Sequence, residues 1–527
     1  MHRGAKACVA LAGLALSWLH AGAALADWRR AETANFVIYS QSSERALREY
    51  AVKLETYDFV LRARTGRSDE ETYYKLPIFL LSSRRQLEVI YDGDRALAGV
   101  YFATSEGPFA VALRGDGVED SDDIIFHEYF HHFSHQTGGL SAAPGWVIEG
   151  MAEYYMTAEI TANSVEIGGF NESRAYWLVN ARWIPVEDLL RKSPADYTRP
   201  EQVSAYYSQA WLLMHWFLSD AERRAQLTGA LQDMAEGADP VAAVEQRTGL
   251  SPEALQRELR AYMRDRLNAI RYEFPRREVE MTVTRLPPSA DDLLLLSQRL
   301  KLPGNESERA ALAETVRRAA ARHPEDPFAR LQLGHAELHF GDAVVGEAIL
   351  TRLLEAEPQN VEALQLMATR RLQQAEETPD QARVRSREAL AFLARAYAVE
   401  PTHYYTLMLI ARSREWADDY PNDNDIEAWT QAYLLAPQLA ESRLGLSRAL
   451  MMRERFEEAA DLLRPLANAP HGGGAAGYAR ELLRSAEARE GPGVQVDMEA
   501  LAPPEPVAPQ PEEGEPAPRP EPGPPPA

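Results

Sequence analysis

The sequence predicts an α+β domain followed by an all-α array of helical repeats, and two observations support this division. Residues 28 to about 275 alternate short β-rich runs with amphipathic stretches. From about residue 290 the composition changes to alanine, leucine, arginine and glutamate, with a helical period and few strand formers. At 527 residues the chain is also too long for a single hydrophobic core. We therefore expect folded units at 27–275 and 290–490, joined by a linker at 276–289.

The first 26 residues are expected to form a signal peptide. Arg3 and Lys6 give a basic start, residues 7–19 form an apolar run, and Ala24-Leu25-Ala26 has the small-x-small pattern of a cleavage site. The apolar run is too short to span a bilayer, and no later segment is better suited, so no transmembrane segment is expected. Cleavage after Ala26 would make the mature protein periplasmic or secreted.

Within the first unit, four short runs have the composition of β-strands, namely residues 35–40, 76–81, 99–103 and 109–113. An amphipathic stretch, 43–62, separates the first two runs. If the last run lies at a sheet edge, it could pair with an extended peptide.

Four helices are expected in the same unit. The first begins near Ser121 or Asp122 and ends at Gly138-Gly139, since glycine favours the left-handed conformation that stops a helix. The other three are expected from about Pro144 through Tyr155, at 202–219, and at 251–268, where Ser251 and Pro252 form a cap followed by a first-turn proline.

The second unit has prolines at regular intervals. They occur at positions 324, 358, 401, 437 and 470, which gives intervals of 34, 43, 36 and 33 residues. A period near 34 with paired helices resembles tetratricopeptide repeats (TPRs), and the longer interval contains an insertion at 376–385. An ordinary helical bundle with chance spacing is the alternative. Repeats of this kind usually bind peptides or proteins, so a protein partner is expected. The last segment, 491–527, is rich in proline and glutamate and is expected to be disordered.

Charge and cysteine content narrow the class of protein. The net charge of −23 argues against binding to nucleic acid, whose phosphates require a basic surface. The only cysteine, Cys8, lies in the expected signal peptide. The mature chain would therefore contain no disulfide bond.

The pentapeptide His127-Glu128-Tyr129-Phe130-His131 carries the clearest chemical signal. Two histidines one helical turn apart lie on the same face and can bind one Zn²⁺ together. After seventeen further residues, Glu149 can supply a third ligand and leave the fourth position for water or substrate. Glu128 is then placed to accept a proton from the zinc-bound water and to return it to the leaving group. We expect one zinc ion per chain.

Other residues are candidates for supporting roles. Glu153 follows Glu149 by one helical turn, and we expect it to accept a hydrogen bond from a ligand histidine. Tyr206 and Tyr207 are both candidates for donating a hydrogen bond to the oxyanion, and ordinary packing is the alternative for either. His132 and His135 extend the histidine cluster, and we expect them to be solvated or to lie at the helix end.

With these residues in place, residues 28–275 resemble the gluzincins, zinc peptidases related to thermolysin and the large aminopeptidases, and in particular the bacterial peptidase-MA-like domains. The resemblance lies in His127–His131, in the segment Gly145–Tyr154 with its Trp-x-x-Glu-Gly pattern, and in Tyr207 with the four residues after it. It implies zinc at His127, His131 and Glu149, Glu128 as the base, and Tyr207 rather than Tyr206 as the oxyanion donor.

The sequence also departs from that family. The interval between the second histidine and Glu149 is slightly shorter than in thermolysin, and the Gly-x-Met-Glu-Asn signature of aminopeptidases is absent. The resemblance implies an α+β zincin-like metallopeptidase domain followed by an all-α TPR-like helical solenoid. We expect a secreted or periplasmic zinc-dependent peptidase whose repeats dock a substrate or partner. The alternatives are a TPR-type scaffold with an inactive peptidase-like domain, and a zinc hydrolase of non-peptide amides or esters.

Overall fold

The computed structural model describes residues 27–493, with gaps at 68–71, 73, 92–98, 115–121, 138–139, 141–142, 170, 265–266 and 470–472. The predicted signal peptide, the glycine pair 138–139 and all but the first residues of the predicted tail lie outside the described residues. No helix in the described part of the chain is both long and apolar enough to cross a membrane.

A six-stranded mixed sheet lies at the centre of the first unit, and the four predicted strands belong to it. Its strands follow the order β4 (Gly99–Phe102), β5 (Phe109–Leu113), β3 (Leu76–Leu81), β2 (Phe36–Ser40), β1 (Arg29–Glu32) and β9 (Thr282–Arg285). The pairs β2–β3 and β3–β5 are parallel, whereas the other three pairs are antiparallel.

The topology differs from two expectations. Residues 282–285, in the segment expected to be a linker, form β9 and pair along all four positions with β1. The short Thr-Val-Thr-Arg run has strand-forming residues but too little apolar periodicity to predict a strand. Strand β5 is not an edge, since β3 and β4 flank it, and its five residues are all buried. A peptide therefore cannot pair with β5, and the edge on that side is β4.

Helices cover both faces of the sheet because residues alternate sides along each strand. In β3, Ile78 and Leu80 pack in the larger core with α1 (Glu44–Thr65) and α3 (Asp122–Thr137). Phe79 and Leu81 face the opposite core, which includes residues of α2 (Arg84–Ile90) and α11 (Ser289–Arg299). The helix α11 at the start of the second unit thus completes a core of the first.

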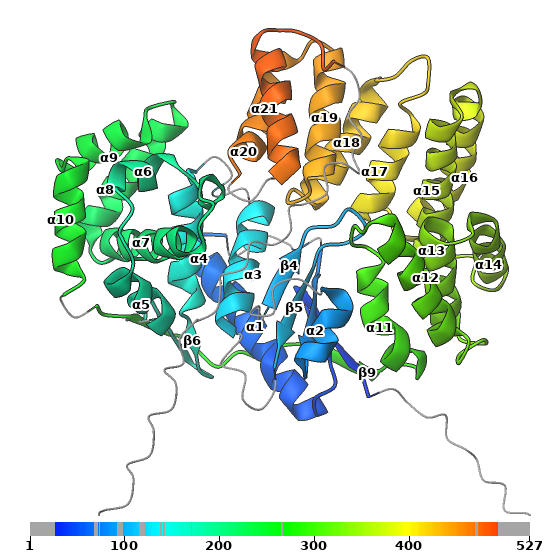
Figure 1. Cartoon of the computed structure of the whole chain (residues 1–527), viewed down its shortest axis with the longest axis horizontal. Coiled ribbons are helices and arrows are strands. Elements are labelled where there is room, and N and C mark those ends of the chain that lie inside the picture. Colours follow the sequence, from blue (N-terminus) through cyan, green and yellow to red (C-terminus); the bar gives the residue numbers. More distant parts are fainter. Residues whose placement is uncertain are drawn as a thin grey trace, which may run out of the picture.

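The remaining helices of the first unit form a helical lobe beside the sheet (Figure 1). They are α4 (Gly145–Met156), α5 (Glu172–Asn180), α6 (Val186–Arg191), α7 (Pro200–Leu218), α8 (Ala221–Ala235), α9 (Pro240–Thr248) and α10 (Pro252–Tyr262). A small antiparallel sheet accompanies them, in the order β6 (Glu159–Ile160), β7 (Ser164–Ile167) and β8 (Ile270–Glu273). Helix α10 has the predicted Ser251 cap but ends earlier than expected, where Arg264 N–H bonds the Ala261 carbonyl three residues back.

The second unit is a helical solenoid. Its further helices are α12 (Glu306–Ala320), α13 (Pro327–Phe340), α14 (Ala343–Ala356), α15 (Val361–Glu377), α16 (Ala382–Val399), α17 (Tyr404–Ser413), α18 (Asp423–Leu435), α19 (Ala440–Met452), α20 (Phe456–Ala467) and α21 (Gly473–Glu487). The prolines at 324, 358, 401 and 437 each follow the second helix of a pair, as the sequence spacing predicted. The insertion at 376–385 extends the α15–α16 pair, with a short 3₁₀ turn (Pro379–Gln381) between the two helices.

The solenoid contacts the sheet through the β4–β5 loop, residues 103–108. Tyr404 at the start of α17 donates a hydrogen bond to the Ser105 carbonyl at 3.0 Å. The ring of Tyr404 also packs edge-on against Tyr74, with centroids 5.5 Å apart, and Tyr74 bonds the Pro108 carbonyl. Figure 1 shows the solenoid curving from α11 at the side of the sheet to α21 above α3.

Candidate metal centre

Helix α3 carries the two motif histidines and is fixed to the sheet side by aromatic and polar contacts. The Tyr57 ring stacks on Phe126 with centroids 4.1 Å apart, and its hydroxyl donates to the Phe126 carbonyl. Tyr129 donates to buried Asp58 at 2.7 Å. At the helix start, buried Asp122 pairs with Lys53 and Arg114, and its negative charge is favourable at a helix N-terminus.

The structure brings His127, His131 and Glu149 together. Their facing atoms form a nearly equilateral triangle, with Nε2 of His127 3.1 Å from Nε2 of His131. The Glu149 carboxylate oxygen Oε2 lies 3.6 Å and 3.5 Å from the same two nitrogens. Glu149 is completely buried, whereas each histidine side chain keeps 13% of its surface exposed. The open side of the triangle is therefore the histidine side.

This triangle fits a zinc ion. Zinc bonds of about 2.0–2.1 Å in a tetrahedron place neighbouring ligand atoms about 3.3–3.4 Å apart. The three observed separations bracket that value. Two imidazole nitrogens and one carboxylate oxygen are also the donor set that zinc takes in catalytic sites, where a fourth position stays open. No rearrangement of these three side chains is needed to hold the metal.

Close packing of α4 on α7 places Glu149 beside Tyr207. A β-carbon added to Gly150 would lie 2.7 Å from the Ala210 carbonyl oxygen, so only glycine allows this approach of the two helices. On the next turn, the Trp146 ring stacks on Phe217, with centroids 6.0 Å apart. The glycine that follows Glu149 in the motif is therefore a packing requirement of the site.

Glu153 lies behind His127. Its Oε1 atom is 3.2 Å from Nδ1 of His127, and the Glu153 side chain is completely buried. When Nδ1–H donates to this carboxylate, the proton is held on Nδ1 and the lone pair of Nε2 faces Glu149 and His131. Arg174 from α5 binds the far side of Glu153 through Nε and Nη2, the latter at 2.7 Å.

The buried charges leave the centre strongly favourable to a cation. Burial would lower the pKa of His127, but its hydrogen bonds to the Glu149 and Glu153 carboxylates raise it to about 10. Burial would raise the pKa of Glu153, but Arg174 and His127 hold it below its usual range. Two carboxylates thus act on one imidazole from opposite sides. A dication bound by His127, His131 and Glu149 would neutralise them in place of that proton.

Tyr207 and Glu128 border the triangle. The Tyr207 ring lies edge-on to His127, with centroids 6.2 Å apart, and the Arg174 guanidinium stands 5.5 Å above the same ring. Burial and the carboxylates of Glu149, Glu153 and Glu128 raise the pKa of Tyr207 well above its usual value, so the phenol keeps its proton. Glu128 is half-buried, and its charge contributes to the raised pKa of His127.

The neighbouring candidates have other roles. The Tyr206 hydroxyl donates to the Lys192 carbonyl at 2.9 Å, which leaves Tyr207 as the phenol beside His127. His132 is only 1% exposed, contrary to expectation, because it lies on the sheet-facing side of α3. Its Nδ1 atom is 3.1 Å from the Tyr101 hydroxyl on β4. His135 is exposed near the helix end, as expected.

Sequence reasoning missed Arg174. The residue is 8% exposed and contacts two members of the site, Glu153 and Tyr207. It follows Asn171, whose side chain caps α5 by accepting from the Arg174 N–H. A cap followed by arginine is a common surface pattern, and nothing in that local spacing points toward α3 or α4. Only the packing of α5 on α7 reveals the contact.

Comparisons with known proteins add little to this geometry. No protein-family model matches the chain. No curated protein matches it either. Among solved structures, the chain is similar to the crystal structure of a thermophilic TPR protein from Thermus thermophilus, at 19% identity and a TM-score of 0.32. The matched region covers 38% of this chain and 99% of that one.

Proposed function

We propose that the chain is a zinc-dependent peptidase with its active centre at His127, His131 and Glu149. The observation that carries the proposal is the triangle of ligand atoms, with separations of 3.1, 3.5 and 3.6 Å, beside the half-buried Glu128. A structural zinc site would use four protein ligands, whereas three ligands with one open side are typical of a catalytic site. Glu128 is the only acidic residue of the pentapeptide.

Each residue of the centre has its own proposed role in hydrolysis. Zinc, when bound, polarises a water molecule and the substrate carbonyl. Glu128 accepts the proton of the attacking water and delivers it to the leaving amine. Tyr207 keeps its phenolic proton and donates a hydrogen bond to the oxyanion without adding charge. Glu153 holds the proton of His127 on Nδ1, and Arg174 fixes Glu153 in place.

The solenoid is proposed to dock the substrate protein or a partner. Helix arrays present extended surfaces that suit peptides and proteins. Its later helices come near α3, since Tyr404 at the start of α17 packs on Tyr74, whose ring centroid lies 6.4 Å from that of His132 in α3. A bound protein segment on the array would then be close to the metal centre. We also propose that the protein acts outside the cytoplasm, on the basis of the signal-peptide pattern at residues 1–26.

The test is hydrolysis of a diverse peptide library by three preparations: zinc-loaded protein, chelated protein, and chelated protein given zinc again. The proposal predicts cleavage by the first and third only. A parallel set of ester and non-peptide amide substrates decides the substrate class. Cleavage confined to that set would replace the peptidase by a hydrolase of non-peptide substrates. Zinc binding with no hydrolysis of either set would favour a scaffold that binds proteins through its repeats.

A further inference from the structure

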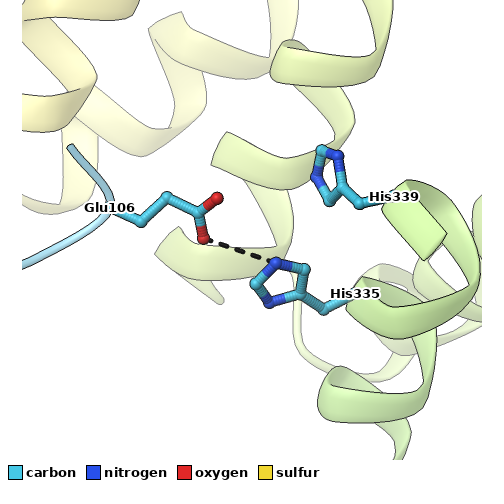
Figure 2. A group of neighbouring side chains, drawn as sticks. All are labelled: Glu106, His335 and His339. Carbon is cyan, nitrogen blue, oxygen red and sulfur yellow. Dashed lines mark ion pairs between the residues drawn. The ribbon is translucent and has the colours of Figure 1, made fainter. Parts of the chain in front are cut away.

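A second group of metal-binding side chains lies between the sheet and the solenoid. Glu106 from the β4–β5 loop faces His335 and His339, which are one turn apart on α13 (Figure 2). The three side chains offer ligand atoms that all lie within 4.8 Å of one another. Glu106 Oε2 is 3.4 Å from Nε2 of His335, the contact drawn as a dashed line in Figure 2. None of these residues takes part in the centre at His127.

His335 is the most informative member of this group. Its side chain is 1% exposed, yet neither of its ring nitrogens has a hydrogen-bond partner among the described residues. Buried polar groups in proteins are nearly always paired, because an unpaired one loses its hydrogen bonds to water without replacement. Burial also lowers the pKa of His335 to about 4, so the imidazole is neutral near pH 7. A neutral imidazole is the form of histidine that binds a metal ion.

The surroundings of the group also suit a metal. His339 Nδ1 lies 3.3 Å from the side-chain amide of Gln373 on α15, and such an outer contact orients a ligand histidine. Glu106 keeps 27% of its side chain exposed, which leaves a path for an ion to enter. Lys301 opposes cation binding, because its positive charge lies close to this loop. Its ammonium nitrogen is 3.7 Å from the position that a β-carbon on Gly107, the residue after Glu106, would take. The acidic residues Glu362 and Glu441 favour cation binding, because their negative charges act on His335 and Glu106, respectively.

We propose that Glu106, His335 and His339 bind a second zinc-type dication that joins the β4–β5 loop to the solenoid. Two imidazoles and one carboxylate favour zinc over magnesium or calcium, which prefer oxygen ligands only. The one separation measured within the group, 3.4 Å between Glu106 Oε2 and Nε2 of His335, is close to the value of about 3.3 Å in a zinc tetrahedron. The same loop already contacts Tyr404, so the metal would add to an existing junction rather than create one.

The experiment measures zinc per chain after equilibrium dialysis, by elemental analysis of the full-length protein. The probe is Zn²⁺ alone, with four proteins: wild type, His335→Gln, His131→Ala and the double variant. We expect two, one, one and no zinc ions per chain. One ion in wild type, one in His335→Gln and none in His131→Ala would overturn the second site while leaving the first intact. None of these readouts depends on activity, so failure of this proposal is separate from failure of the proposed peptidase.

A gain-of-affinity variant guards against misfolding as the cause of zinc loss. Removing the positive charge of Lys301 by Lys301→Gln, in the His131→Ala background, is expected to tighten zinc binding roughly tenfold. A damaged fold would weaken binding instead. Glu106→Gln in the same background is expected to lose the remaining ion. Unchanged zinc affinity in Lys301→Gln together with retained zinc in Glu106→Gln would overturn the assignment of these ligands.

Discussion

Arg174 binds Glu153 through two guanidinium nitrogens, and Glu153 contacts Nδ1 of His127 on its other side. This chain of contacts links α5 through α4 to the face of α3 that carries His127. Glu153 is completely buried, so its charge depends on Arg174 for compensation. The orientation of His127, a proposed zinc ligand, therefore depends through Glu153 on Arg174 in α5.

Replacing Arg174 tests this link. Arg174→Gln leaves a buried carboxylate without its cationic partner, which typically costs about 3–5 kcal/mol of stability. Zinc affinity should also fall by about 10- to 100-fold, because an outer contact of a ligand histidine is lost. Denaturant unfolding and zinc titration measure the two effects. The matched control is Arg191→Gln, which removes an exposed arginine bound to Asp239 and should change neither quantity much. Equal effects of the two substitutions would refute the role of Arg174.

Gly150 tests the packing that places Glu149. In Gly150→Ala the new β-carbon would lie 2.7 Å from the Ala210 carbonyl oxygen, so α4 and α7 must separate. We expect a loss of about 1–3 kcal/mol in unfolding free energy, together with weaker zinc binding. The control is Gly477→Ala in α21, where the nearest atom is an arginine side-chain nitrogen at 3.9 Å. That exposed helical position should gain about 0.5–1 kcal/mol. If Gly150→Ala were equally stabilising, the close approach of α4 and α7 would be wrong.

Tyr207 tests the proposed oxyanion donor. Tyr207→Phe removes the hydroxyl but keeps the ring beside His127, so kcat should fall by roughly 10²- to 10³-fold at unchanged zinc content. Tyr206→Phe is the matched control, because that hydroxyl bonds the Lys192 carbonyl. It should lower stability by about 1 kcal/mol and leave kcat near wild type. The reverse pattern of kcat values would assign the donor to Tyr206.

His403 predicts a pH dependence of stability away from the metal centre. Burial lowers the pKa of His403 to about 4, and its Nδ1 lies 3.2 Å from the Gln365 amide nitrogen. The unfolded chain binds a proton at this histidine near pH 6.5, whereas the folded chain does not until about pH 4. Stability should therefore decrease as the pH falls through this window. Thermal unfolding of chelated protein at pH 7.5 and 5 should show a smaller pH-dependent loss in His403→Gln than in wild type. An equal loss in both proteins would contradict the prediction.

Local signals predicted the parts of the fold that depend on local chemistry. The runs at 76–81 and 109–113 were predicted to the residue as strands because both are bounded by turn formers and rich in apolar residues. Helices with a serine cap or a first-turn proline were also predictable, as at Ser251 and Pro252. Prolines located the ends of the helix pairs because proline cannot continue a helix.

Features set by distant contacts were not predictable from one sequence. Strand β9 is short and only its pairing with β1 defines it. The interior position of β5 depends on the crossover that brings β3 alongside. Of the candidate site, the pairing of His127 with His131 and that of Glu149 with Glu153 followed from helical spacing, and Glu149 was expected as a third ligand from its motif. Arg174 and the group formed by Glu106 with His335 did not, since each joins residues from separate parts of the chain.

The most direct test of the proposed peptidase compares wild type with Glu128→Gln at equal zinc content. Glutamine keeps the size of Glu128 but cannot accept a proton from water. With zinc per chain matched by elemental analysis, we predict peptide cleavage by wild type and a loss of at least roughly 10²-fold in kcat for Glu128→Gln. Equal rates of cleavage by the two zinc-loaded proteins would contradict the proposed mechanism.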